Sequence, residues 1–144
     1  MARIVIHHMA AHRESDQAAF KFVRSVLHEI RFQARLTLFH GPYTTGRLAQ
    51  SIDIKGPYIE PGRRVHGSVG SDLSYAAVVE KGARPHLIFP IPPRKYMKFY
   101  WRRVGRVVYP DKVRHPGMKG KGYLRNAAQV AARRHRMLLI IYDV

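Results

Sequence analysis

The distribution of apolar positions predicts one long amphipathic helix over residues 15–39. Apolar side chains recur there at every third or fourth position, as a helix with one buried face requires. Ser15 and Asp16 suit its N-terminus, and Gly41-Pro42 ends it because proline cannot continue the hydrogen-bond ladder. The residues expected to face the core are Phe20, Val23, Leu27, Ile30, Ala34 and Leu38.

A hairpin is expected after this helix. Residues 44–49 suit a short turn or helix, and residues 50–72 alternate apolar and polar side chains between Gly-Pro and Pro-Gly steps, which predicts two strands. Residues 74–81 are typical of a short helix. Gly82 closes that helix because glycine readily adopts the left-handed conformation.

The second half of the chain predicts short extended segments and a loop. Residues 86–91, 96–102 and 106–113 are rich in aromatic and β-branched side chains and are separated by prolines and a glycine. Residues 114–122 contain three glycines and a proline, so a flexible loop is expected there. A basic helix is expected over residues 124–136.

Together these elements predict a single α+β domain over residues 1–144. The long amphipathic helix and shorter helices would pack on a mixed or antiparallel β-sheet, leaving its other face or an edge for a neighbour. An N-terminal arm is expected over residues 1–13, and a C-terminal strand or tail over residues 137–144.

Charge points to an anionic partner, because 26 Lys and Arg stand against 9 Asp and Glu, a formal net charge of +17. Residues 94–136 hold 14 of the cations and one acid, Asp111, and are the expected contact surface. The absence of cysteine excludes disulfides and thiolate sites. No apolar run approaches the ~18 to 20 residues that span a bilayer, so a soluble intracellular protein without a membrane partner is expected.

Nine histidines raise the question of a metal site, and His7, His8 and His12 form the densest group. In an extended segment His7 and His8 point to opposite faces, and no acidic cluster stands beside them. We therefore expect no metal and no cofactor.

Glu80 is the one acid in a setting that suggests chemistry, near the end of an apolar helix and before Arg84-Pro85-His86. A general acid would need a companion carboxylate or nucleophile, whereas a structural role needs only a basic group or a backbone N–H. The structural role is favoured, and no catalytic residue is predicted.

Cations and aromatic side chains alternate over residues 94–103. Such a segment can stack bases and neutralise phosphates, but it is also typical of a strand with a buried aromatic face and a solvated basic face, which is favoured. Most of these cations are expected to face neighbouring protein chains. The contact candidates are Arg94, Lys95, Lys98, Arg102, Arg103, Arg106, His115, Lys119 and Lys121.

Three short motifs follow one another along the chain. They read Thr-Gly-x-Leu-x-x-Ser, Tyr-x-x-x-x-Glu-x-Gly-x-x-Pro-His and His-Pro-Gly-x-x-x-x-x-Tyr-Leu-x-x-Ala. In this order they resemble siphophage neck and tail-completion proteins, in which Phe is common at the position of Tyr123. The matching residues are Thr45, Gly46, Leu48, Ser51, Tyr75, Glu80, Gly82, Pro85, His86, His115, Pro116, Gly117, Tyr123, Leu124 and Ala127.

The resemblance implies a non-enzymatic structural protein of the virion of a long-tailed bacteriophage, assembled in the host cytoplasm. It would be a ring subunit of the head-to-tail junction, of the tail-completion or tail-terminator type, with a sixfold ring favoured. Its partners would be copies of itself and the adjacent head-closure, connector and tail-tube or terminator proteins, with transient contact to genome DNA in the lumen.

The alternative is a small basic nucleic-acid-binding protein or a toxin-type ribonuclease. Net charge does not separate these classes from an assembly protein. In a ribonuclease, Glu80, Arg84 and His86 would have to supply the acid, the phosphate-binding group and the base.

Overall fold

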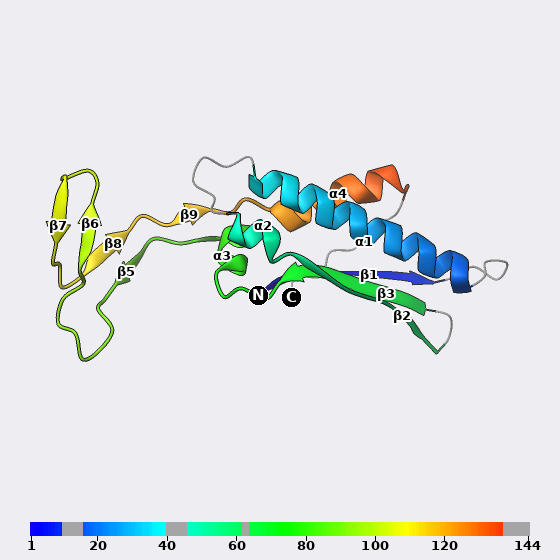
Figure 1. Cartoon of the computed structure of the whole chain (residues 1–144), viewed down its shortest axis with the longest axis horizontal. Helices are drawn as coiled ribbons and strands as arrows, with labels where there is room; N and C mark the ends of the chain where they lie inside the picture. The colour runs from blue at the N-terminus through cyan, green and yellow to red at the C-terminus, as the bar shows by residue number, and fades with distance from the viewer. Residues whose placement is uncertain (10–15, 40–45, 62–63, 137–144) are drawn as a thin grey trace.

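The computed structural model describes residues 1–9, 16–39, 46–61 and 64–136. Figure 1 shows a body, in which two helices lie over a sheet, and a thin two-stranded arm that extends from one end of it. The chain combines helices and strands in small sheets around one long helix, which confirms the α+β class.

The sheet of the body has three antiparallel strands in the order β1-β3-β2. β2 (Asp53–Glu60) and β3 (Arg64–Ser71) form the hairpin that the sequence predicts. The register between them shifts between Lys55 and Tyr58, where Gly56-Pro57 interrupts the ladder.

The N-terminal residues differ from the arm that the sequence predicts over residues 1–13. Residues 2–9 form the edge strand β1 (Ala2–Met9), which pairs with β3 from Ala2 opposite Ser71 to Met9 opposite Arg64. Ala2, Ile4 and Ile6 are at most 5% exposed, because alternate residues of a strand point to the same face and this face meets the helices. Residues 10–13 lie outside the described part of the chain.

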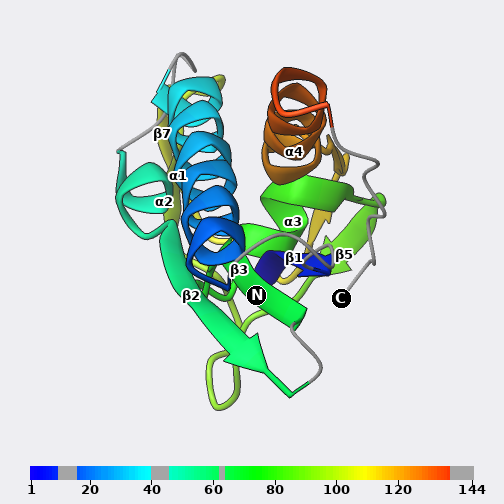
Figure 2. The ribbon, with the colours of Figure 1, turned by 90° about the vertical axis from the view of Figure 1, so that its right-hand side faces the viewer.

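Two helices cover one face of the sheet, α1 (Asp16–Phe39) and α4 (Tyr123–Arg134), and Figure 2 shows them side by side. Val23, Leu27 and Ile30 are fully buried, as predicted, whereas Phe20 is only partly buried at the rim of the core. A side chain at Gly67 of β3 would place its Cβ 2.5 Å from Leu27, so this glycine lets α1 approach the sheet.

Short helices complete the body near the expected positions. α2 (Arg47–Gln50) follows α1, and α3 (Ala76–Lys81) ends at Gly82, whose φ of 90° suits glycine. No described helix is long and apolar enough to cross a membrane. The C-terminal strand or tail expected over residues 137–144 lies outside the described residues.

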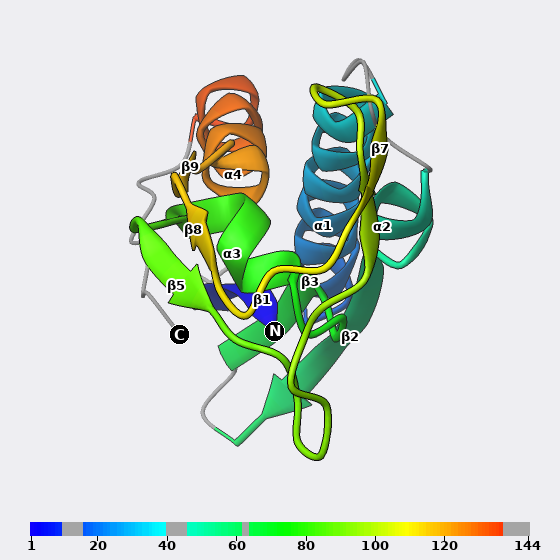
Figure 3. The same cartoon turned by 90° about the vertical axis from the view of Figure 1, so that its left-hand side faces the viewer.

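Residues 82–122 form the arm. It consists of three successive antiparallel strand pairs, and they form a ribbon separate from the sheet of the body (Figures 1 and 3). The pairs are β4 (Gly82–Ala83) with β9 (Met118–Lys119), β5 (His86–Ile88) with β8 (Val113–His115), and β6 (Phe99–Trp101) with β7 (Arg106–Val108).

The root of the arm replaces the flexible loop that the sequence predicts over residues 114–122. The Lys121 amide donates to the carbonyl of Val79 at 2.8 Å, and the Gly122 amide donates to the carbonyl of Glu80 at 3.0 Å. A Cβ at Gly120 would lie 2.5 Å from the Glu80 carbonyl oxygen. Here the glycines permit a close backbone approach, a role that the sequence pattern does not distinguish from flexibility.

Candidate interaction surface

The arm exposes large apolar side chains along its length. Phe99, Tyr100 and Trp101 of β6 are between 36% and 61% exposed, so the strand with a buried aromatic face, expected over residues 94–103, is not present. A two-stranded ribbon has no second layer against which to bury its side chains. The other exposed large apolar residues of the arm are Leu87, Ile88, Phe89, Ile91, Tyr96, Val104, Val107, Tyr109 and Met118.

The cations of the chain are dense on this arm. Residues 82–122 carry 11 Lys and Arg against one acid, Asp111. All nine contact candidates lie on the arm; eight are exposed and His115 is half-buried. Within the described part of the chain, none of these Lys and Arg side chains forms an ion pair with a carboxylate, so their charge is directed to solvent or to another molecule.

The β6–β7 hairpin combines cations with aromatic rings at the distal end of the arm. Phe99 pairs with Val108, Tyr100 with Val107 and Trp101 with Arg106. Lys98 Nζ lies 5.8 Å from the centre of the Tyr109 ring, within the range of a cation–π contact.

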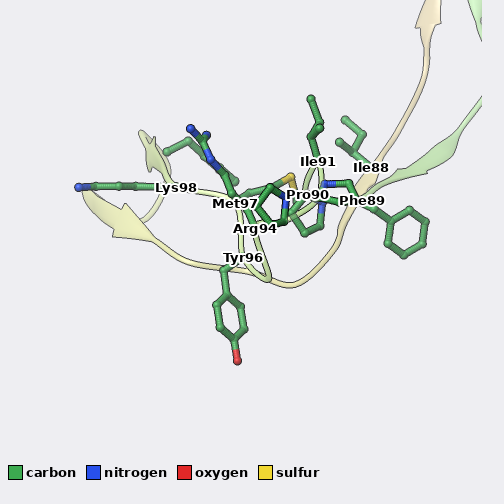
Figure 4. A pocket seen from close by; sticks show the side chains of 11 residues that line it. Ile88, Phe89, Pro90, Ile91, Arg94, Tyr96, Met97 and Lys98 are labelled. Atoms are coloured by element: carbon green, nitrogen blue, oxygen red, sulfur yellow. The ribbon is translucent and has the colours of Figure 1, made fainter.

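An open hollow of about 720 Å³ lies beside this hairpin, where the chain from β5 to β6 folds back on itself. Its walls are mostly apolar, and it is bordered by Arg94 and Lys98. Figure 4 shows Ile91 and Arg94 extending to the same side of this loop and Tyr96 to the opposite side. The apolar wall residues Phe89, Ile91 and Met97 are not predicted from the sequence; the prolines crowded around them are the signal that a folded loop, not a regular strand, lies here.

Two of the sequence motifs meet at the root of the arm. His86 and His115 pair across β5 and β8, and their rings stack with centres 5.0 Å apart. A backbone contact orients each ring, since His86 Nδ1 lies 2.9 Å from the Arg84 carbonyl and the Gly117 amide donates to His115 Nδ1 at 3.1 Å. A Cβ at Gly117 would lie 2.5 Å from the Ala83 carbonyl oxygen. The Pro-His and His-Pro-Gly residues therefore hold the two strands of the arm together.

Glu80 joins the second motif to α4. Its carboxylate accepts hydrogen bonds from the backbone amides of Leu124 at 2.9 Å and Arg125 at 3.0 Å. Gly122, which precedes the helix, supplies no side-chain cap, so the Glu80 carboxylate satisfies amides that the helix leaves without a partner. This is the structural role that the sequence favours for Glu80.

Tyr123, in the first turn of α4, is fully buried against the core. Burial, and secondarily the Glu80 carboxylate, raise the pKa of its phenol well above the usual value. The hydroxyl finds no hydrogen-bond partner among the described residues. Phenylalanine would therefore fill this position without leaving a buried polar atom unpaired.

The first motif has a structural role beside the hairpin of the body. Ser51 Oγ lies 2.8 Å from Ser71 Oγ and also donates to the Leu48 carbonyl. Gly46 precedes α2 with a φ of 73°, and Leu48 packs into the core. Thr45 lies outside the described residues.

The three residues that a ribonuclease would need are not brought together in the described part of the chain. Both Glu80 carboxylate oxygens bind amides of α4, while His86 contacts Arg84 and stacks on His115. In the described part of the chain, neither Arg84 nor His86 contacts the Glu80 carboxylate. The three side chains are near in sequence but engaged in different structural roles.

The N-terminal histidines lie on two faces of the sheet. His7 stacks on His66 with ring centres 5.7 Å apart, whereas His8 contacts Phe22 of α1. Among the described residues, no three His, Asp or Glu side chains are grouped to hold a metal ion. His12 lies outside these residues.

Comparisons with protein-family models, with curated proteins and with solved structures found no match.

Proposed function

We propose that this chain is a structural assembly protein of a long-tailed bacteriophage, a ring subunit of the head-to-tail junction. The observation that carries the proposal is the arm: 41 residues that extend from the body and expose apolar and cationic side chains together. The order of the three motifs supports the same class.

The arm has the physical character of a surface that another molecule covers. An isolated ribbon is marginal in water, and contiguous exposed apolar surface usually marks an interaction site. Bodies that contact one another through two different surfaces form heterologous contacts, and such contacts build closed rings when the rotation closes. The arms would then reach from the ring to adjacent proteins. A sixfold ring between head and tail proteins is the assembly that we propose.

The test removes the arm beyond the pair of β4 and β9. Residues 86–115 are replaced by a Gly-Gly turn between Pro85 and Pro116 in the genome that encodes the chain. We expect the free energy of unfolding of the shortened protein to equal that of the parent to within ~0.5 kcal/mol, because the removed strands pack mainly on one another and contribute little to the core of the body. Filled heads and free tails should accumulate without joining. Normal yields of joined particles would contradict the proposal.

The second candidate, a nucleic-acid-binding protein, is favoured by one observation. The exposed rings of Tyr100 and Trp101 stand beside Arg102 and Arg103, a combination that stacks bases and binds phosphates. Tight RNA or DNA binding that weakens steeply with salt and is lost in Trp101→Ala would support this function. RNA cleavage lost in a folded Glu80→Gln variant would identify a ribonuclease.

A further inference from the structure

The hollow at the distal end of the arm combines two chemistries in one place. Phe89 is 61% exposed and Ile91 is 82% exposed, so their apolar surface faces solvent beside the hollow. Arg94 and Lys98 border the same space and have no carboxylate partner among the described residues. Its occupant must therefore offer apolar surface and negative charge together.

Charge argues against a second copy of this chain as that occupant. Outside the arm, the chain carries 15 Lys and Arg against 8 acids. Several of these acids are already engaged: Asp72 with Arg3 at 2.9 Å and Lys55 at 3.3 Å, and Glu80 with the amides of α4. Docking the arm on another copy would bring like charges together, which is unfavourable.

The residues that line the hollow favour a protein over a nucleic acid as its occupant. Phosphates would pair with the cations, and bases would stack on the rings of Phe89, Tyr96 and Phe99. The larger part of the lining is formed by Ile88, Ile91, Met97 and three prolines, which neither phosphates nor stacked bases use. A large apolar side chain of a protein would fill this wall and lose its contact with water. An acidic protein segment that carries such a side chain would contact both the apolar wall and the cations Arg94 and Lys98.

We propose that the hollow binds an acidic segment of a different protein through one large apolar anchor residue. The anchor packs against Ile88, Ile91 and Met97, and carboxylates on either side of it pair with Arg94 and Lys98. This inference deepens the proposed function and rests on it for the identity of the partner, which would be a protein of the adjacent ring.

The experiment needs no knowledge of that partner. A library of random peptides is displayed and selected on the immobilised full chain, and the affinities of the selected peptides are then measured by fluorescence polarisation. Four variants are compared with the parent: Ile91→Ser, the double change Arg94→Glu with Lys98→Glu, and two controls. The controls are Lys112→Glu with Arg114→Glu, which makes the same change of charge on exposed cations elsewhere on the arm, and Phe32→Ser, an exposed apolar residue of α1.

The selected peptides should carry Asp or Glu around a Leu, Phe or Trp. Their affinity should fall about ten-fold or more in both hollow variants and less than about two-fold in the controls. Failure to enrich any peptide, equal losses in the Lys112 and Arg114 control, or equal competition by a single-stranded oligonucleotide would overturn the proposal. Because this binding is measured on the purified chain, its failure leaves the particle-joining test of the proposed function intact.

Discussion

Replacing Glu80 by alanine should destabilise the body by releasing the N-terminus of α4. The change removes two hydrogen bonds, of 2.9 and 3.0 Å, from a carboxylate to the amides of Leu124 and Arg125. A hydrogen bond to a charged group contributes ~1.5 to 3 kcal/mol, but the Arg125 amide is in an exposed setting, so solvent reduces its share. We expect a loss of about 2 kcal/mol in the free energy of unfolding.

Urea denaturation followed by circular dichroism measures this loss. With a slope of ~1 to 3 kcal/mol per molar urea, the midpoint should fall by about 1 M. Glu80→Gln keeps one acceptor oxygen and should lose about half as much. Asp111→Ala, which removes an exposed acid from the arm, is the control and should leave the midpoint unchanged. A midpoint for Glu80→Ala equal to that of the parent, or an equal fall in the control, would refute the capping role.

Three further results are expected. Leu27→Ala, in the centre of the core, should cost ~2 to 5 kcal/mol, and stability equal to the parent would mean that α1 does not bury this face. Tyr123→Phe should retain or raise stability, by about 1 kcal/mol, because it removes a buried hydroxyl without a partner among the described residues. Because the pKa of Tyr123 is raised in the folded state, the unfolded state ionises first as the pH rises above about 10. The free energy of unfolding of the parent should therefore fall relative to that of Tyr123→Phe above this pH, and equal losses in the two proteins would contradict this.

The helices could be predicted because their signals are local. The apolar repeat of α1 and the glycine after α3 determine their elements within a few residues of chain. β1 is missed for a specific reason: Ala2, Ile4 and Ile6 show the alternation of a half-buried strand, but only the distant strand β3 supplies the partner that makes them core residues.

The arm could be predicted only as separate strands. The interleaving of cations and aromatic side chains in residues 94–103 is the same whether the aromatic side is buried or exposed, and only tertiary packing decides between them. Likewise, the glycines near residue 120 are compatible with a flexible loop until Glu80 and Gly82 are placed beside them. The signal that was available is charge, because a cation density this high is incompatible with burial of the segment inside its own chain.

Cryo-electron microscopy of purified particles from the genome that encodes this chain is the sharpest test of the proposed head-to-tail ring. We predict a ring of density between head and tail into which copies of this chain fit, with each arm reaching from its body to an adjacent protein. Complete, joined particles that contain no copy of the chain would contradict it.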